Sequence, residues 1–174
     1  MKSLLLITFS FLSVSVFAQE IQPESFKKYR SAYGVMGNHR ALGIQGEYKF
    51  VRDFGFKVLG AKVLGYEKAN DYGYAVISLI TYYIPSKIKY IEPVLGLGGM
   101  YTLYHWNVSR KSGDIHDITF GGGFGLNFRF NDYFRTGINL FLANNYTSSY
   151  RQGYLKKTGR ELLVLPTLTL EYLF

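Results

Sequence analysis

The chain has no cysteine among its 174 residues. This absence excludes a disulfide framework, and it excludes a lipoprotein held in a membrane by a lipid-modified cysteine. Charge is also scarce: Asp, Glu, Lys and Arg make up 18% of the chain, against about 25% in an average soluble domain. The composition is therefore not that of a typical soluble globular domain.

A long hydrophobic segment is missing from most of the chain. After the first eighteen residues, the longest largely apolar run is YAVISLITYYI, from Tyr74 to Ile84. A transmembrane helix needs about 20 consecutive apolar residues. If this chain spans a membrane, we do not expect it to do so with helices.

The N-terminal segment has the features of a signal peptide. Lys2 precedes the apolar run from Leu4 to Val16, and Val16-Phe17-Ala18 places small residues at the positions that a signal peptidase requires. We expect a signal peptide at residues 1–18, cleavage after Ala18, and a single exported domain at residues 19–174. The formal net charge of +8 does not suggest nucleic acid as a partner, because the domain is exported.

What the sequence does contain is alternation with a period of two, which predicts β-strands exposed differently on their two faces. In the clearest run, Phe120, Phe124 and Leu126 share one face, and Gly123 and Asn127 share the other. Eight such runs are present, at 28–38, 41–50, 54–66, 72–84, 89–105, 116–130, 133–146 and 161–174. The alternation is interrupted near Gly60, where we expect a bulge.

The connections between these runs alternate in length. Three are tight: at Arg52-Asp53, at residues 84–87 and at Asn131-Asp132. The links at residues 106–115 and 147–160 are long, and we expect them to be loops. Short turns on one rim and long loops on the other are typical of outer-membrane barrels. The sequence therefore predicts an all-β fold, an eight-stranded antiparallel up-and-down transmembrane β-barrel.

A soluble lipocalin-like barrel is the alternative, with the apolar face inside. Two features favour an apolar exterior. The polar face is rich in Gly, Ala, Thr and Asn, as a narrow packed lumen requires. Aromatic residues gather near the tight turns and would form a girdle at the membrane–water boundary; they are Phe50, Phe54, Tyr82, Tyr83, Tyr90, Phe128, Phe130, Tyr133 and Phe134.

The final segment, LTLEYLF, is similar to the closing strand of bacterial outer-membrane barrels. Tyr172 and Phe174 match the two aromatic positions that the barrel-assembly machinery reads in those proteins. Over residues 19–174 the chain resembles the small eight-stranded barrels of the OmpA/OmpX type. The resemblance implies a monomer in the outer membrane of a Gram-negative bacterium, in contact with lipid and lipopolysaccharide. It also implies a structural or surface-interaction role, with a small pore as the alternative and a lipid A-modifying enzyme third.

No motif in the sequence indicates catalysis, a metal or a cofactor. Of the three histidines, His105 and His116 fall near the long-loop rim on neighbouring strands, without an evident acidic partner. The run GGGFG at Gly121 to Gly125 lacks the Lys-Ser/Thr ending of a phosphate-binding loop. We expect no enzyme activity and no cofactor.

Two groups of charged residues suggest a function or a structural role. The last long link contains Arg151, Lys156, Lys157 and Arg160, which could contact lipopolysaccharide phosphates, since arginine pairs well with phosphate. The second group faces the lumen near the short turns, and there we predict an ion-pair ring in which Glu171 bridges Arg135 and Arg30, and Glu92 lies beside Arg129. The members of this ring are Arg30, Lys49, Glu92, Arg129, Arg135 and Glu171.

Overall fold

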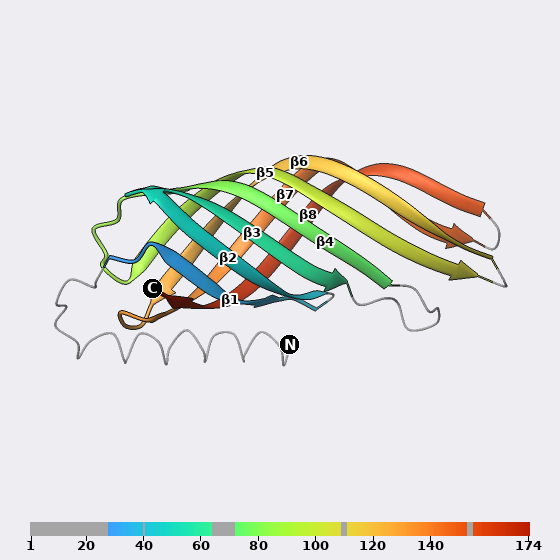
Figure 1. Ribbon diagram of the computed structural model, residues 1–174. Coiled ribbons are helices and arrows are strands. Elements are labelled where there is room, and N and C mark those ends of the chain that lie inside the picture. The colour runs from blue at the N-terminus through green and yellow to red at the C-terminus, as the bar shows by residue number, and fades with distance from the viewer. Residues whose placement is uncertain (1–27, 40, 64–71, 109–110, 153–154) are drawn as a thin grey trace, which may run out of the picture.

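A computed structural model describes residues 28–39, 41–63, 72–108, 111–152 and 155–174. Within these ranges, eight antiparallel strands follow one another around a closed barrel (Figure 1). The strands are β1 (Ser31–Gly37), β2 (Ala41–Val51), β3 (Phe54–Val63), β4 (Tyr72–Tyr83), β5 (Ile91–Val108), β6 (Lys111–Arg129), β7 (Phe134–Gln152) and β8 (Leu155–Leu173). The predicted architecture is confirmed. The predicted signal peptide, residues 1–18, lies outside the described residues.

The barrel closes where β8 pairs with β1. Their register runs from Ala32↔Leu173 to Gly37↔Leu168. Beyond the strand ends, the backbone N–H of Phe174 donates to the carbonyl oxygen of Ser31 at 2.8 Å. Closure removes the open sheet edges, which could not be accommodated in hydrocarbon because their amides would lack hydrogen-bond partners.

The apolar face of the barrel is its outer face. On β6, Ile118 and Phe120 are 68% and 75% exposed, whereas Thr119 between them is 3% exposed. The same alternation continues on the other strands, where Ile44, Leu97, Leu168 and Phe174 are among the exposed large apolar residues. A lipocalin-like barrel would have the opposite arrangement, so the prediction of an apolar exterior is confirmed. Among the described residues, no helix is long and apolar enough to span a membrane.

Two hairpins extend beyond the rest of the barrel. In Figure 1 the β5–β6 and β7–β8 hairpins continue past the ends of β1–β4, at the end opposite to the short turns. Pairing between β6 and β7 ends at Gly121↔Ala143, but β5–β6 pairing continues to Val108↔Lys111 and β7–β8 pairing to Gln152↔Leu155. The expectation of long loops at residues 106–115 and 147–160 was therefore wrong, since most of both links is paired strand.

The expected bulge at Gly60 was also wrong. Strand β3 pairs in continuous register through Gly60, which lies opposite Ile44 on β2 and Val76 on β4. The register shifts lie instead between Lys49 and Val51 on β2 and between Ala143 and Tyr146 on β7. The weak alternation around Gly60 therefore reflects the residues on the inner face, where β3 carries both charged and apolar side chains.

Most aromatic residues near the short turns lie on the outer surface, as a girdle requires. Phe54 packs against Tyr82 with ring centroids 4.9 Å apart, and Phe134 packs against Tyr172 at 5.1 Å. Tyr83 is an exception to the prediction, because its side chain is buried inside the barrel.

Candidate functional site

An ion cluster fills the barrel interior at the short-turn end; it consists of Glu47, Lys57, Glu92, Arg129, Arg135 and Glu171. Arg135, at the start of β7, is fully buried at its centre. Its Nη2 lies 2.5 Å from Glu47 Oε2 on β2 and 2.5 Å from Glu171 Oε2 on β8. Its Nη1 lies 3.1 Å from Glu92 Oε2 on β5. One guanidinium therefore connects strands from opposite sides of the barrel, which its fork of N–H donors makes possible.

Lys57 is the second cation buried in the ion cluster. Its Nζ lies 3.6 Å from Glu47 Oε2 and 3.5 Å from Glu171 Oε1. Two buried carboxylates thus face two buried cations, so that the charges of Glu47, Glu171, Arg135 and Lys57 balance. Burial of a charge is tolerated when it is paired in this way, and removing one partner is strongly destabilising.

Two tyrosines complete the hydrogen bonding of the ion cluster. The Tyr83 hydroxyl donates to Glu47 Oε1 at 2.5 Å, and the Tyr29 hydroxyl donates to Glu92 Oε2 at 2.9 Å. Arg135 Nη1 also donates to the Tyr29 hydroxyl oxygen. Tyr29 precedes β1, and burial raises the pKa of its phenol well above the usual range, so it remains a donor. The ammonium of Lys49 lies over both rings, 3.9 Å from the Tyr29 centroid and 3.7 Å from the Tyr83 centroid.

Two of the three contacts predicted for the ion-pair ring are confirmed, and the bridge from Glu171 to Arg30 is wrong. Glu171 is buried against Arg135, and Arg129 Nη1 lies 3.7 Å from Glu92 Oε1. Arg30 was assigned to the ring wrongly: it precedes β1 and is exposed at the rim. Lys57, and not Arg30, is the second cation that contacts Glu171.

Sequence reasoning missed two members of the ion cluster, Glu47 and Lys57. Glu47 shares a strand face with Lys49, so the alternation of β2 contained the signal for it. Lys57 was missed because the assumed bulge at Gly60 left the inner face of β3 undefined. A regular alternation through Phe56 and Val58, both outward and exposed, would have placed Lys57 inside.

Farther from the short turns, the interior becomes apolar. An apolar layer of Met36, Leu59, Ile77, Met100, Phe141 and Ala143 packs across the lumen, with Leu79 and Leu165 against it. Between this layer and the ion cluster lie the buried polar side chains of Gln45, Thr81 and Asn127. The interior is therefore a packed core with a charged end, as expected for eight strands.

The histidines near the long-hairpin end lie on the outer surface. The sequence showed no acidic partner for them, but His105 Nδ1 lies 2.6 Å from Asp114 Oδ1 on the neighbouring strand. His116 Nδ1 lies 2.7 Å from the Tyr101 hydroxyl. These contacts form a polar patch beyond the apolar band of β5 and β6. In the described part of the chain, no group of three or more His, Cys, Asp or Glu is arranged to hold a metal ion.

The four basic residues of the predicted lipopolysaccharide contact lie on the extended part of the β7–β8 hairpin. The register pairs Arg151 with Lys156, Tyr150 with Lys157, and Thr147 with Arg160. All four therefore belong to the paired strands of this hairpin, on the tip side of the outward Leu162 and Val164. The backbone thus brings the four basic residues together on one hairpin; the structure does not describe their side chains.

Comparison with known proteins identifies the fold. The chain matches no protein-family profile, and no curated protein sequence is significantly similar to it. Among solved structures, it is similar to the N-terminal β-barrel domain of Pseudomonas aeruginosa OprF (TM-score 0.64, 14% identity, 84% of this chain and 98% of that chain). The chain has the fold of the small outer-membrane barrels.

Two further solved structures agree with this assignment. Neisserial surface protein A, NspA, is similar with a TM-score of 0.59 and 11% identity, over 83% of this chain and 93% of that chain. The outer membrane protein OprG from Pseudomonas aeruginosa gives a TM-score of 0.58 and 14% identity, over 87% of this chain and 99% of that chain. At these identities the similarity concerns the fold.

Proposed function

We propose that this protein is an outer-membrane barrel of a Gram-negative envelope with a structural or surface-interaction role. The observation that carries this proposal is the combination of an apolar exterior with an interior packed from the ion cluster to the apolar layer. Such a barrel is suited to anchoring the extended β5–β6 and β7–β8 hairpins at the membrane surface. The similar solved structures, among them the outer membrane protein OprG, support the location.

Cell fractionation tests the location. The protein should be found with the outer membrane, and it should migrate differently on SDS gels when it has not been heated, because a closed hydrogen-bonded barrel resists detergent until it is thermally unfolded. Recovery from the soluble periplasm would contradict the proposal.

Contact with lipopolysaccharide is the finer part of the proposal. Arg151, Lys156, Lys157 and Arg160 lie on the extended hairpin beyond the outward-facing Leu162 and Val164, where the hairpin would leave the hydrocarbon and reach the lipid headgroups. Charge-assisted hydrogen bonds to phosphate are among the strong ones. A variant with Gln at Arg151, Lys156, Lys157 and Arg160 should bind lipopolysaccharide vesicles several-fold more weakly than the original chain.

Basic residues at the short-turn rim supply a matched control for this experiment. The basic residues exposed there, at the opposite end of the barrel, include Lys28, Arg30, Arg52 and Lys87. Changing these four to Gln should leave binding to the vesicles unaltered if the hairpin is the contact. Equal losses from both sets would indicate a response to net charge alone and would contradict the assignment of the hairpin.

The two alternative functions, a small pore and a lipid A-modifying enzyme, can each be tested by a separate measurement. A small pore would give steady conductance in planar bilayers, whereas we expect none because the apolar layer and the ion cluster both cross the lumen. The His105–Asp114 pair is the observation that would favour a lipid A-modifying enzyme. We expect the mass spectrum of lipid A to be the same with and without the protein, and a change that depends on His105 would contradict the proposed role.

A further inference from the structure

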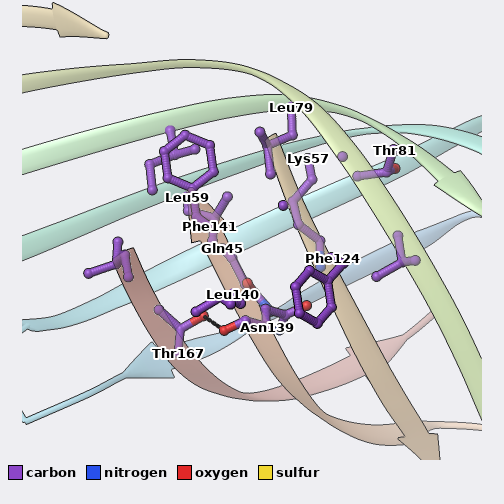
Figure 2. A pocket seen from close by; sticks show the side chains of 15 residues that line it. Gln45, Lys57, Leu59, Leu79, Thr81, Phe124, Asn139, Leu140, Phe141 and Thr167 are labelled. Carbon is purple, nitrogen blue, oxygen red and sulfur yellow. Dashed lines mark hydrogen bonds between the residues drawn. The ribbon is translucent and has the colours of Figure 1, made fainter. Parts of the chain in front are cut away.

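A small cavity lies inside the barrel, between the ion cluster and the apolar layer. Its volume is about 40 Å³, and residues from every strand from β2 to β8 line it (Figure 2). Leu59, Ile77 and Phe141 of the apolar layer form part of its wall. Its polar lining residues are Gln45, Lys57, Thr81, Asn139 and Thr167. The wall of the cavity is therefore mostly apolar, and a few polar side chains reach it.

Two of the polar side chains at this cavity have unsatisfied hydrogen-bonding groups. Gln45 is 5% exposed and Thr81 is 2% exposed. Within the described residues, neither Gln45 Nε2 nor Gln45 Oε1 has a hydrogen-bond partner, and the Thr81 Oγ1 has none. A buried polar group without a partner is destabilising, and native proteins satisfy nearly all such groups. The position of these groups beside a cavity points to a bound polar ligand.

We propose that this cavity is an internal hydration site, in which two or three water molecules bind the Gln45 amide and the Thr81 hydroxyl. One water needs roughly 10–15 Å³ of such volume and two to four polar partners, so the cavity is large enough for a small cluster. The Gln45 amide offers two N–H donors and one acceptor oxygen, and the Thr81 hydroxyl can both donate and accept. Water can satisfy this mixed set, since each molecule donates and accepts.

The surroundings exclude other ligand classes. Lys57 is the charged side chain among the described cavity-lining residues, and it is already engaged by Glu47 and Glu171. A bound ion would therefore lack a counter-charge, which is costly in a low-dielectric interior. A volume of about 40 Å³ is also too small for a sugar or an acyl chain. The remaining rival is a dry cavity, since cavities lined by apolar side chains can stay empty and bind xenon.

Crystallography under xenon pressure separates the wet cavity from the dry one. The refolded protein should show ordered water within hydrogen-bonding distance of Gln45 and Thr81, and no xenon at this position. A xenon peak without water in the unaltered protein would overturn the proposal. In solution, the Gln45 side-chain amide should show NMR cross-peaks to long-lived water, and their absence would equally contradict it.

A pair of variants makes the test specific to these side chains. Changing Gln45→Leu and Thr81→Val together removes the polar partners, so the water should be lost and any remaining space should accept xenon. Thr119→Val is the matched control: Thr119 is also a buried inward threonine, but its hydroxyl donates to Asp117 at 3.3 Å and it is not among the described cavity-lining residues. This control should keep the water. Ordered water retained in the double variant would overturn the assignment to Gln45 and Thr81.

Discussion

Arg135 and Glu171 occupy directly opposed positions on β7 and β8, and their side chains meet inside the barrel with Nη2 and Oε2 2.5 Å apart. Strand β8 also forms the closing seam with β1, where Glu171 lies opposite Gly34. The carboxylate of Glu171 therefore joins the last two strands and, through Lys57, the strand β3 on the other side of the seam. Removal of this carboxylate should therefore affect the stability of the barrel.

We expect Glu171→Leu to destabilise the barrel, although leucine is the more apolar residue. The change leaves Arg135 and Lys57 with only Glu47 as a fully buried carboxylate partner. Breaking a buried ion pair by removing one partner costs about 3–5 kcal/mol. Urea unfolding in lipid vesicles should show a loss of this size in the free energy of unfolding.

A second substitution distinguishes the charge effect from simple repacking. Adding Lys57→Met to Glu171→Leu restores the balance, because Glu47 then faces Arg135 alone. The double variant should therefore recover part of the stability that the single variant lost. If the double variant is less stable than Glu171→Leu, the charge imbalance is not the cause of the loss.

The closing seam depends on the absence of a side chain at Gly34. A Cβ built there would overlap the backbone carbonyl oxygen of Leu170 and would lie 2.8 Å from Glu171 Cα. Gly34→Ala should therefore disturb β1–β8 pairing, at a cost of about 1–3 kcal/mol, as expected for overpacking. Gly60→Ala is the control, since a Cβ at Gly60 would meet nothing within 4 Å. Similar unfolding curves for the two variants would show that the seam tolerates a side chain.

Alternation predicted which residues face the lipid and which face the lumen, because one face of each strand meets hydrocarbon and the other a narrow interior. It could also place Arg135 beside Glu171, since they lie on neighbouring strands. The contact between Arg135 and Glu47 could not be found in this way. These residues come from β7 and β2, and their meeting across the lumen depends on the tilt and stagger of the strands.

The extent of the two long hairpins was also beyond the sequence pattern. Past the apolar band, both faces of a strand can be polar, so the period of two that marks a membrane strand fades. The backbone pairing of β7 with β8 nevertheless continues to Gln152↔Leu155. Polar residues such as Ser148 and Ser149 therefore resemble a loop in composition although they are paired in a strand.

A charge in the outward apolar band should be poorly tolerated. Leu97 is 72% exposed on β5, where it pairs with Ile80 and Gly122 in the middle of the barrel wall. Leu97→Arg should reduce the free energy of unfolding in lipid vesicles by about 2–4 kcal/mol, the cost of arginine near the bilayer midplane. Ile88→Arg is the control, because Ile88 is exposed in the connection between β4 and β5. We expect its effect to be below about 1 kcal/mol, and equal effects would argue against lipid around β5.

The aromatic residues at the end of β8 should matter more for assembly in cells than for the stability of the finished barrel. Tyr172 packs against Phe174 with ring centroids 4.7 Å apart and against Phe134 at 5.1 Å. Both are outward-facing, so their loss removes ring contacts of about 0.5–1.5 kcal/mol each together with lipid contact. We expect Tyr172→Ala with Phe174→Ala to lower the amount of folded protein in the outer membrane several-fold and to increase its degradation in the periplasm.

The matched control truncates two other outward residues of the same strand, Leu168 and Leu170, to alanine. Both are exposed on the lipid face of β8. If the machinery that inserts barrels reads Tyr172 and Phe174, the aromatic variant should accumulate poorly in cells while the leucine variant accumulates well. Purified and refolded into vesicles without that machinery, the two variants should fold to similar extents. A refolding defect as large as the defect in cells would mean that Tyr172 and Phe174 act through the stability of the barrel. It would contradict the idea that the insertion machinery recognises them.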